Sequence, residues 1–332
     1  MIFGRRCGML YGFLASMRVH VFFHDRCFDG SATAAVFTEF YRLRYDRQAE
    51  FFYTGLAHRA SQLFDEALFN SDENVIVDFK YSASPRITWW FDHHQSAFLS
   101  LEDAEHFRRD HSGRKFYDPT FKSCTKFLAT VAREKFGFDR PELGELIHWA
   151  DIIDGAQYSG ARTAVEMGAP AMKLTLVMES AKQNVCTKVI GWMTRRNLDE
   201  IAAEPEIQAL FEPLYRRHLE AIDLIRERAR EERGVVFFDL VGAGHEGYNK
   251  FIPYYLFPNS VYTVSVTAAS FRVKVSVGSN PWAPAEPAHN LASICERYGG
   301  GGHARVGAIS FEPGEIERAR AAAEEIVEIL KG

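Results

Sequence analysis

The stretch RVHVFFHDRCFDGSATAAVF, residues 18–37, decides the fold that we expect and raises the question of function. It begins with an apolar run of the kind found in strands buried on both faces of a parallel sheet. Ionisable and thiol side chains follow at His24, Asp25, Cys27 and Asp29, and small residues then open a helix. Such groups at the end of a strand contribute little to a packed apolar core, so their position indicates a functional site.

Similar apolar runs follow along the chain and alternate with helical segments. Strands that alternate with helices indicate an α/β fold, in which ligands bind outside the carboxyl ends of the parallel strands. The expected elements are a helix over 30–43, a strand over 49–53, a helical stretch over 57–69, and strands over 74–79 and 86–94.

A change of pattern near residue 233 predicts a second domain. Residues 121–231 look almost wholly helical and end in a charged stretch that keeps apolar residues at helical spacing, which we interpret as an amphipathic connector. From Gly234 onward, strand-like segments with alternation, a glycine-rich turn and a final Glu/Ala helix predict a smaller α+β domain. The expected boundaries are 18–190 for the first domain with its helical insert, 191–233 for the connector and 234–332 for the second domain.

Residues 1–17 are expected to be a disordered extension or the result of a mis-assigned start. Their short apolar run is followed at once by the strand at Arg18, without the polar spacer that follows the cleavage site of a signal peptide. We therefore expect Met17 to be the true start. No apolar run in the chain reaches the length of a membrane span, so no membrane partner is expected.

Composition limits the classes of partner. The 332 residues carry a formal net charge of −5 at pH 7, so the chain has no overall basic field with which to grip long duplex DNA. The five cysteines are an odd number, widely spaced and without a CxxC pair. This pattern argues against a disulfide framework and predicts a reducing, cytoplasmic location.

Acidic and histidine residues follow three separate predicted strands. They are Asp29, Asp78 and the run Asp92-His93-His94. Because parallel strands end at the same edge of a sheet, we expect these side chains to lie together. Carboxylate and imidazole groups bind hard or borderline divalent cations. A lone Asp after a strand is usually a helix cap, but three such strand ends together predict a metal site.

An apolar helix over residues 145–156 supplies further acids. It ends with Asp151 and Asp154 near a glycine. A carboxylate at the end of this helix can complete a metal site, and the alternative is that both acids are simply exposed on the surface.

Five motifs in order resemble those of the DHH phosphoesterase superfamily. FDHHQSA (91–97) resembles its signature motif, and GGGGHARVGAISF (299–311) resembles the GGGH motif of the associated C-terminal DHHA1 domain. HDRCFDG, VIVDF and WADIID follow the order of the family's other metal motifs. The resemblance implies an α/β catalytic domain with a parallel sheet, joined through a connector helix to a smaller α+β substrate-binding domain.

The resemblance also implies a site for two divalent ions, with Mn²⁺ expected and Mg²⁺ or Co²⁺ as alternatives. Asp78 would bridge the two ions and His24 would bind one of them. The implied ligands of the other ion are Asp29, His93 and Asp151. Asp92 would orient its histidine neighbour or touch metal, and His94 would face the substrate phosphate.

In the first motif, one position departs from the family pattern. The family commonly has Asp-x-Asp-Gly in the first motif, whereas this chain has Cys27-Phe28-Asp29-Gly30. A thiolate prefers softer ions than a carboxylate does. Three interpretations of Cys27 stay open: it is a ligand, it biases the choice of metal, or it leaves the first ion weakly held and helped by Asp25.

The glycine run predicts a phosphate-binding loop. Glycines let backbone N–H groups approach an anion closely, and the resemblance places further contacts on neighbouring strand ends. The expected substrate-binding residues are His94, Gly300, Gly301, Gly302, His303, Arg305, Arg272, Ser276 and Asn280.

The implied function is the hydrolysis of a phosphoester by water activated by two metal ions. The expected substrates are short single-stranded oligonucleotides (nano-RNA) or small nucleotides such as linear dinucleotides and 3′-phosphoadenosine 5′-phosphate. A polyphosphate (phosphoanhydride) hydrolase is an alternative enzyme, and a nucleotide-binding protein with a degenerate site is an alternative of another class. A homodimer is also among the expectations.

Overall fold

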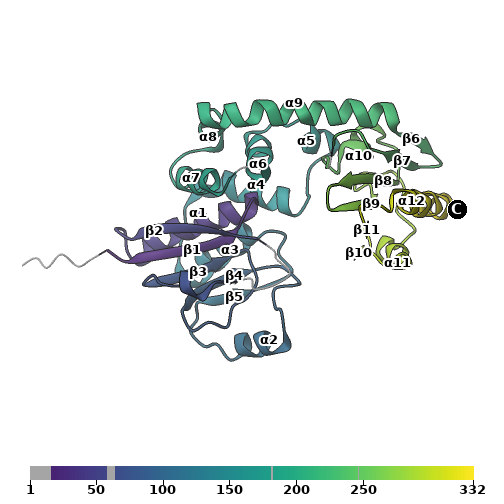
Figure 1. Cartoon of the computed structure of the whole chain (residues 1–332). Helices are drawn as coiled ribbons and strands as arrows, with labels where there is room; N and C mark the ends of the chain where they lie inside the picture. Colours follow the sequence, from purple (N-terminus) through teal and green to yellow (C-terminus); the bar gives the residue numbers. More distant parts are fainter. Residues whose placement is uncertain (1–15, 58–63, 181, 246) are drawn as a thin grey trace, which may run out of the picture. The chain divides into compact units, whose positions relative to one another are not determined.

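The computed structural model describes residues 16–57, 64–180, 182–245 and 247–332 (Figure 1). These residues form two compact units. Among the described residues, the first takes 16–157 and 178–201, and the second takes 158–177 and 202–332. All but the last two residues of the expected extension 1–17 lie outside the described residues. The domain boundaries at 190 and 233 stay a prediction.

A five-stranded parallel sheet organises the first unit. Its strands lie in the order β2-β1-β3-β4-β5, and every neighbouring pair is parallel, which confirms the predicted α/β class. The bounds are β1 Arg18–His24, β2 Glu50–Leu56, β3 Glu73–Val77, β4 Ile87–Asp92 and β5 Lys115–Tyr117.

The register of this sheet brings the ends of three strands to the same edge. Phe23 of β1 pairs with Val77 of β3, and Val77 pairs with Phe91 of β4. The residues that follow these three, His24, Asp78 and Asp92, therefore leave the sheet side by side. This is the edge at which the sequence predicts a metal site.

Two adjacent tryptophans explain why β4 has no polar alternation. Trp89 and Trp90 are both fully buried and point to opposite faces of the sheet, as successive residues of a strand do. Trp89 packs on Phe37 and Phe40 of the helix α1 (Phe28–Arg44). Trp90 packs among the aromatic residues of the other face, which include Tyr81 and Phe107.

Helix α1 is the central helix of the first unit. It is buried along most of its length and contacts β1 together with three other helices. A helix with an apolar surface on all sides is expected to be covered in this way. The other helices of this unit are α2 Leu101–Arg108, α3 Cys124–Phe136, the 3-10 helix η2 Pro141–Leu143, α4 Gly144–Asp154 and α7 Gln183–Met193.

The helical stretch expected over residues 57–69 is wrong where the structure describes it. Residues 58–63 lie outside the described residues, and the remainder holds only a short 3-10 helix, η1 Glu66–Leu68, capped by Asp65. Phe64 and Phe69 pack on one another and on aromatic rings of the sheet's second face. This aromatic packing decides the path of the segment, which helical propensity does not.

The middle of the chain is helical, as predicted. The chain passes between the two units after Gln157, within helix α6, Pro170–Ser180, and within helix α8, Leu198–Ala202. The second unit also contains α5 Ala161–Val165, α9 Pro205–Arg228, α10 Ile252–Leu256, α11 Leu291–Glu296 and α12 Ile316–Lys331. No helix that the structure describes combines the length and the apolar character needed to cross a bilayer.

The second unit is built on a six-stranded sheet of order β10-β11-β9-β8-β7-β6. In β9 the valines at 273, 275 and 277 are buried, and they form one core with apolar residues of α12. The alternate residues of β9 are only partly buried, so this strand has one covered face and one more open face. The bounds are β6 Arg230–Glu232, β7 Val235–Asp239, β8 Tyr262–Ala269, β9 Arg272–Ser279, β10 Gly301–His303 and β11 Val306–Phe311.

Candidate metal centre

The edge of the first sheet carries three overlapping groups of metal-binding side chains. In each group one potential ligand atom per residue lies within 4.8 Å of the others. Asp78 belongs to two of the groups and so does His93, which makes the three groups one connected cluster. The groups are His24 with Cys27 and Asp78, Asp78 with His93 and His94, and Asp29 with His93 and Asp154.

Asp78 lies at the centre of this cluster. Its backbone has a φ of 55°, a conformation uncommon outside glycine and usually retained at functional sites. The residue is 1% exposed, and neither carboxylate oxygen has a hydrogen bond of normal geometry among the described residues. Burial by itself raises the pKa of Asp78, but the imidazoles of His24, His93 and His94 outweigh it and lower the pKa to about 2. Buried and charged, this carboxylate requires a cationic partner.

His93 points its Nε2 atom at several carboxylates. This nitrogen lies 3.4 Å from Oδ1 of Asp78 and 3.3 Å from Oδ2 of Asp154, while Nδ1 donates to the carbonyl oxygen of Phe121 at 3.2 Å. A carbonyl partner on one nitrogen is the usual way to orient a metal-binding histidine. Burial lowers the pKa of His93, but Asp78, Asp29 and Asp154 raise it to about 10. Positive charge is therefore strongly favoured at Nε2.

Asp29 joins the cluster to helix α3. Its two carboxylate oxygens accept hydrogen bonds from the backbone N–H groups of Cys124, at 2.7 Å, and Thr125, at 3.0 Å. Its Oδ2 also lies 3.8 Å from Nε2 of His93. Burial and the carboxylates of Asp78 and Asp154 raise the pKa of Asp29. Asp29 thus both stabilises the start of α3 and adds negative charge to the cluster.

Gly30 is required by the close approach of α1 to the end of β1. A Cβ atom at this position would lie 2.4 Å from the carbonyl oxygen of His24. Asp25, which was a candidate ligand, is in none of the three groups. Its side chain packs on Gly55, where a Cβ atom would lie 2.5 Å from Cγ of Asp25, and it accepts a hydrogen bond from the backbone of Arg26.

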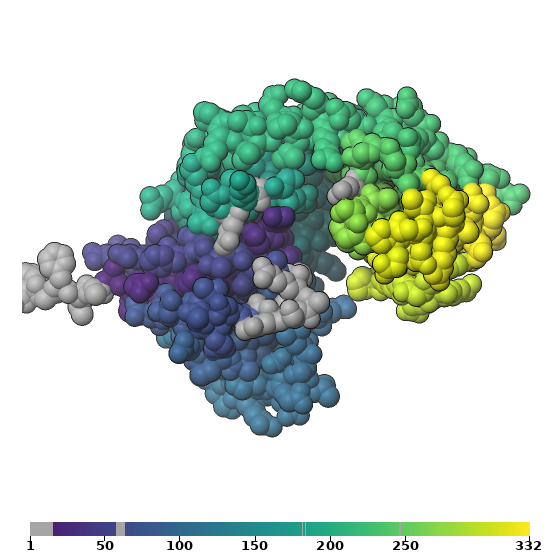
Figure 2. Space-filling model, in the orientation of Figure 1, coloured from purple at the N-terminus to yellow at the C-terminus, as the bar shows by residue number. Residues whose placement is uncertain are grey.

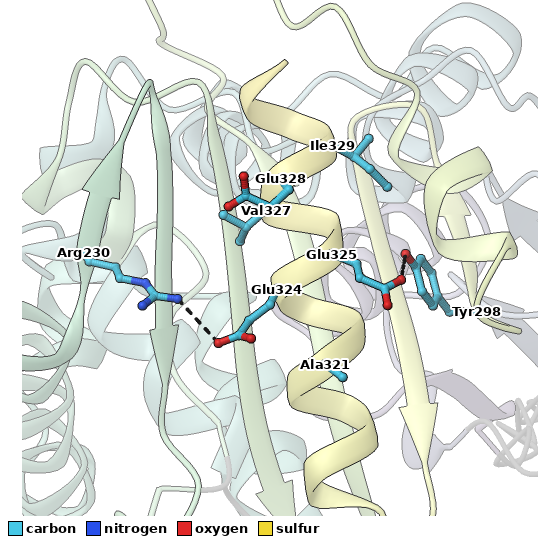
Figure 3. Close-up of a pocket in the computed structure, with 8 residues that line it drawn as sticks. All are labelled: Arg230, Tyr298, Ala321, Glu324, Glu325, Val327, Glu328 and Ile329. Atoms are coloured by element: carbon cyan, nitrogen blue, oxygen red, sulfur yellow. Dashed lines mark hydrogen bonds and ion pairs between the residues drawn. The ribbon is translucent and has the colours of Figure 1, made fainter.

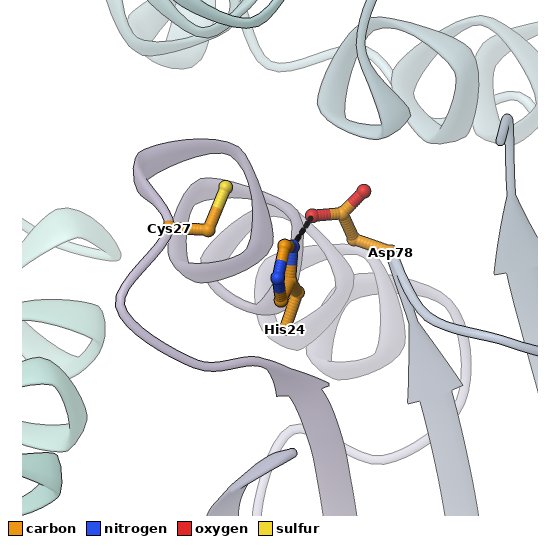
Figure 4. A group of neighbouring side chains, drawn as sticks. All are labelled: His24, Cys27 and Asp78. Atoms are coloured by element: carbon orange, nitrogen blue, oxygen red, sulfur yellow. Dashed lines mark ion pairs between the residues drawn. The ribbon is translucent and has the colours of Figure 1, made fainter. Parts of the chain in front are cut away.

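Cys27 lies at the N-cap of α1, beside His24 and Asp78 (Figure 4). Burial and the negative charges of Asp78, Asp29 and Asp154 raise the pKa of its thiol well above the usual range. Without a cation in the cluster, the thiol therefore stays protonated. A nearby divalent ion reverses this preference, because a coordinating thiol loses its proton.

Asp92 fixes the orientation of His94. It is fully buried, and its Oδ1 accepts hydrogen bonds from the backbone N–H groups of His93 and His94 and, at 2.7 Å, from Nδ1 of the His94 ring. Burial lowers the pKa of His94, but the bond to Asp92 raises it. Of the two histidine rings beside it, Asp92 therefore orients that of His94.

The acid that helix α4 contributes to the cluster is Asp154. Its Oδ2 faces Nε2 of His93, and burial together with Asp78 raises its pKa to about 6. Asp151, which the resemblance implies as a ligand, lies one turn earlier and belongs to none of the three groups. Its Oδ1 accepts a hydrogen bond from the Ser123 hydroxyl at 3.4 Å. The sequence named both acids but carried no signal that separates them.

The predicted phosphate-binding glycines have a structural reason of their own. The expected glycine-rich turn contains the short strand β10, which pairs with β11. A Cβ atom at Gly300 would lie 2.3 Å from the carbonyl oxygen of Ala308, and one at Gly302 would lie 2.2 Å from that of Val306. Close strand packing therefore requires both glycines, whatever anion they bind.

The structure separates the other predicted substrate residues into different environments. His303 and Arg305 lie exposed at the β10–β11 hairpin, where Nη2 of Arg305 pairs with Oε2 of Glu286 at 3.0 Å. Asn280 is 2% exposed, and its amide nitrogen donates to the carbonyl oxygens of Pro258 and Ser260. Asn280 therefore holds two loops together, and its amide nitrogen is already engaged.

Arg272 lies far from the β10–β11 hairpin, which is called the glycine-histidine hairpin below. It begins β9, whereas Ser279, whose backbone N–H donates to the carbonyl oxygen of Arg305 at 3.0 Å, ends the same strand. At about 3.4 Å per residue, the seven steps between the two strand ends span roughly 24 Å. Ser276 lies between these two strand ends, on the more open face of β9.

A groove of about 650 Å³ lies along α12 (Figure 3), and Figure 2 shows the C-terminal residues, in yellow, at the surface of the second unit. Its polar lining is partly paired. Nη2 of Arg230 lies 3.8 Å from Oε1 of Glu324, and the Tyr298 hydroxyl donates a hydrogen bond to Oε2 of Glu325. The groove contains no predicted site residue, and its acidic lining is unsuited to a phosphate. Its lining residues are Arg230, Tyr298, Ala321, Glu324, Glu325, Val327, Glu328 and Ile329.

Comparison with known proteins identifies the fold. No family model matches the sequence, and no curated protein matches it. Among solved structures, a protein described as a pGpG-specific phosphodiesterase, PggH, from Vibrio cholerae is 18% identical with a TM-score of 0.68, and the match covers 95% of this chain and 100% of that one.

Two further structures share this architecture. The DHH domain of a member of the s1p family of ribosomal proteins is 14% identical with a TM-score of 0.57, covering 95% of this chain and 88% of that one. RecJ in complex with Mn²⁺ from Thermus thermophilus is 13% identical with a TM-score of 0.51; the match covers 95% of this chain but 52% of RecJ. The motif resemblance is thereby confirmed at the level of the fold.

Proposed function

We propose that this protein is a DHH-superfamily phosphoesterase that uses divalent metal ions to hydrolyse short oligonucleotides or small nucleotide phosphates. The observation that carries the proposal is the buried carboxylate of Asp78, which lies between histidines on two sides and has no normal hydrogen bond of its own. A hydrogen-bonded structural aspartate does not leave both oxygens unsatisfied. A bridging metal ligand does so until its ions bind.

The donor set suits two divalent ions. His24 and Asp78, with Cys27 beside them, would hold one ion, and Asp29, Asp78, His93 and Asp154 would hold the other. Ions bound there would supply a water molecule of lowered pKa and would neutralise charge on the phosphoryl oxygens. Mn²⁺ is the ion that we expect in the site with only nitrogen and oxygen donors, and Mg²⁺ or Co²⁺ can take its place.

The protein's own residues would position the substrate phosphate. The bond from Nδ1 of His94 to Asp92 holds the ring, so that Nε2 is left to donate a hydrogen bond to a phosphoryl oxygen. Because His94 is partly exposed while Asp92 is fully buried, the ring can meet a ligand and its support stays fixed. Donors held in place in this way cost no reorganisation during the reaction.

Nucleotides are the substrate class that the comparisons support. Two of the proteins that share the fold are described as a pGpG-specific phosphodiesterase and as RecJ. In the second unit, His303 and Arg305 are the exposed candidates for phosphate contacts, together with Ser276. The net charge of −5 is consistent with a short substrate and not with a long duplex.

The test is a panel of substrates with metal-stripped, full-length protein. Linear dinucleotides, RNAs of three to five nucleotides, 3′-phosphoadenosine 5′-phosphate and polyphosphate are incubated with Mn²⁺, Mg²⁺ or Co²⁺. We expect the release of mononucleotide or phosphate from at least one nucleotide substrate, and no release after Asp78→Asn. Turnover of polyphosphate alone would favour a phosphoanhydride hydrolase, and nucleotide binding without turnover of any substrate would favour a binding protein.

A further inference from the structure

The two ends of the metal cluster differ in donor chemistry. The group of Asp29, His93 and Asp154 offers only nitrogen and oxygen, whereas the group of His24, Cys27 and Asp78 also offers sulfur. Divalent ions discriminate sharply between such sets, because thiolates favour Zn²⁺ and other borderline or soft ions while carboxylates suit Mg²⁺ and Mn²⁺. The position of the sulfur therefore bears on which ion each half binds.

The backbone directs Cys27 into the cluster. Cys27 occupies the N-cap of α1 in an extended conformation, and its side chain makes no capping hydrogen bond. Ser, Thr, Asp or Asn at this position would normally accept a bond from the first turn of the helix. In Figure 4 the sulfur, the His24 imidazole and the Asp78 carboxylate face one another. The contact of Gly30 with the His24 carbonyl fixes the start of α1 there.

A second observation independently indicates a ligand at this place. Oδ2 of Asp78 faces the same group, lies 3.6 Å from Nδ1 of His24, and has no hydrogen bond of normal geometry although it is buried. Other cysteine sulfurs are used differently: those of Cys124 and Cys186 donate to the carbonyl oxygens of Phe91 and Met178. Those two cysteines serve the core, whereas Cys27 faces an imidazole and a charged carboxylate.

We propose that Cys27 binds one of the two ions as a thiolate, so that the half formed by His24, Cys27 and Asp78 prefers Zn²⁺ or Co²⁺ to Mg²⁺. The inference rests on the proposed function only in treating the cluster as a metal centre. On binding, the S–H bond breaks, the proton passes to solvent, and the sulfur lone pair forms the metal–sulfur bond, with no change of oxidation state. One half of the metal cluster therefore tolerates hard ions, and the other half is selective for softer ions.

Cobalt titration of the full-length, metal-stripped protein tests this directly. A thiolate bound to Co²⁺ gives a sulfur-to-metal charge-transfer band in the near ultraviolet. We expect this band in the wild type and in the control Cys295→Ser, whose cysteine is buried in the second unit. We expect no band in Cys27→Ser or in Cys27→Asp, which restores the commoner carboxylate.

Metal affinity gives the second readout. Cys27→Ser should weaken the binding of Zn²⁺ at one of two sites by at least about tenfold, the lower end of the loss seen when even a partner of a metal ligand is removed. Cys27→Asp should still bind two ions, with Mg²⁺ affinity higher than in the wild type. Circular dichroism of each variant checks the fold, and if Cys27→Ser does not fold, Cys27→Asp decides.

The outcomes separate this inference from the proposed function. Two bound Co²⁺ ions without a thiolate band in the wild type, or a band that persists in Cys27→Ser, would overturn the role of Cys27 and leave the hydrolase proposal standing. A thiolate band that depends on Cys27, in a protein that turns over no phosphoester, would keep the ligand and refute the hydrolase.

Discussion

Unusual residues gather in two regions of this molecule, at the edge of the first sheet and at the glycine-histidine hairpin of the second unit. At the first edge, Asp78 has a positive φ and buried carboxylate oxygens without a hydrogen bond of normal geometry. At the hairpin, Gly300 and Gly302 are required by neighbouring backbone oxygens, and Asn280 holds two loops. The contrast teaches that a polar group left without a partner indicates chemistry, whereas an unusual residue whose contacts are complete indicates packing.

The largest expected effect is that of Asp78→Asn. It should lower phosphoesterase activity by on the order of a thousandfold, the upper range for the loss of one preorganised electrostatic group. The metal-free protein should lose only a little thermal stability, because a carboxylate whose pKa is lowered by neighbouring imidazoles stabilises the fold, while Asn tolerates the positive φ. Melting curves with and without Mn²⁺ provide the check: the metal-dependent stabilisation should disappear. A large loss of metal-free stability would make Asp78 a structural residue and remove the contrast.

A pair of variants in α4 tests which acid belongs to the site. Asp154→Asn should weaken Mn²⁺ binding at least about ten- to a hundredfold, the loss seen when even a partner of a metal ligand is removed, whereas Asp151→Asn should leave it nearly unchanged. Isothermal titration of the metal-stripped proteins measures both. If Asp151→Asn has the larger effect, the ligand implied by the family resemblance is right and the geometry at Asp154 is misleading.

The glycines of the hairpin should behave as packing residues. Gly302→Ala and Gly300→Ala should each cost about 1–3 kcal/mol of unfolding free energy, as overpacking does, because the added methyl group meets a backbone oxygen. Gly301→Ala is the matched control, since a Cβ atom there meets nothing within 4 Å. Chemical denaturation measures the three variants. A Gly301→Ala protein of unchanged stability whose substrate KM rises sharply would show that the run binds an anion closely as well.

The smallest effect is expected for Glu286→Gln. This change releases Arg305 from its exposed partner, and exposed ion pairs contribute little to stability, so the melting temperature should stay the same. If Arg305 contacts the substrate phosphate, KM should fall by roughly twofold, in keeping with the weakness of such pairs. Steady-state kinetics at low salt is the measurement, with Arg305→Gln as the companion variant. An unchanged KM in both variants would exclude Arg305 from substrate binding.

The amino-acid pattern predicted the parallel sheet and the edge at which the cluster forms. An apolar run without polar alternation indicates a strand that is buried on both faces of a parallel sheet. Parallel strands end at the same edge of the sheet, so the side chains of His24, Asp78 and Asp92 are expected to lie close together. These are consequences of local pattern and of strand direction, and they do not depend on the details of packing.

Which of several residues close together in the chain take part in the site depends on tertiary contacts. The sequence favours Asp151 and Asp154 equally, and the packing of α4 on α1 and α3 places Asp154 beside His93. The glycine run predicts an anion-binding loop from its sequence, but the pairing of β10 with β11 accounts for two of its glycines. Residues 64–69 turn away from a regular helix because their phenylalanines pack on the sheet. At Asp154 and at residues 64–69 the deciding contact joins residues distant in sequence, and local pattern carries no information about such contacts.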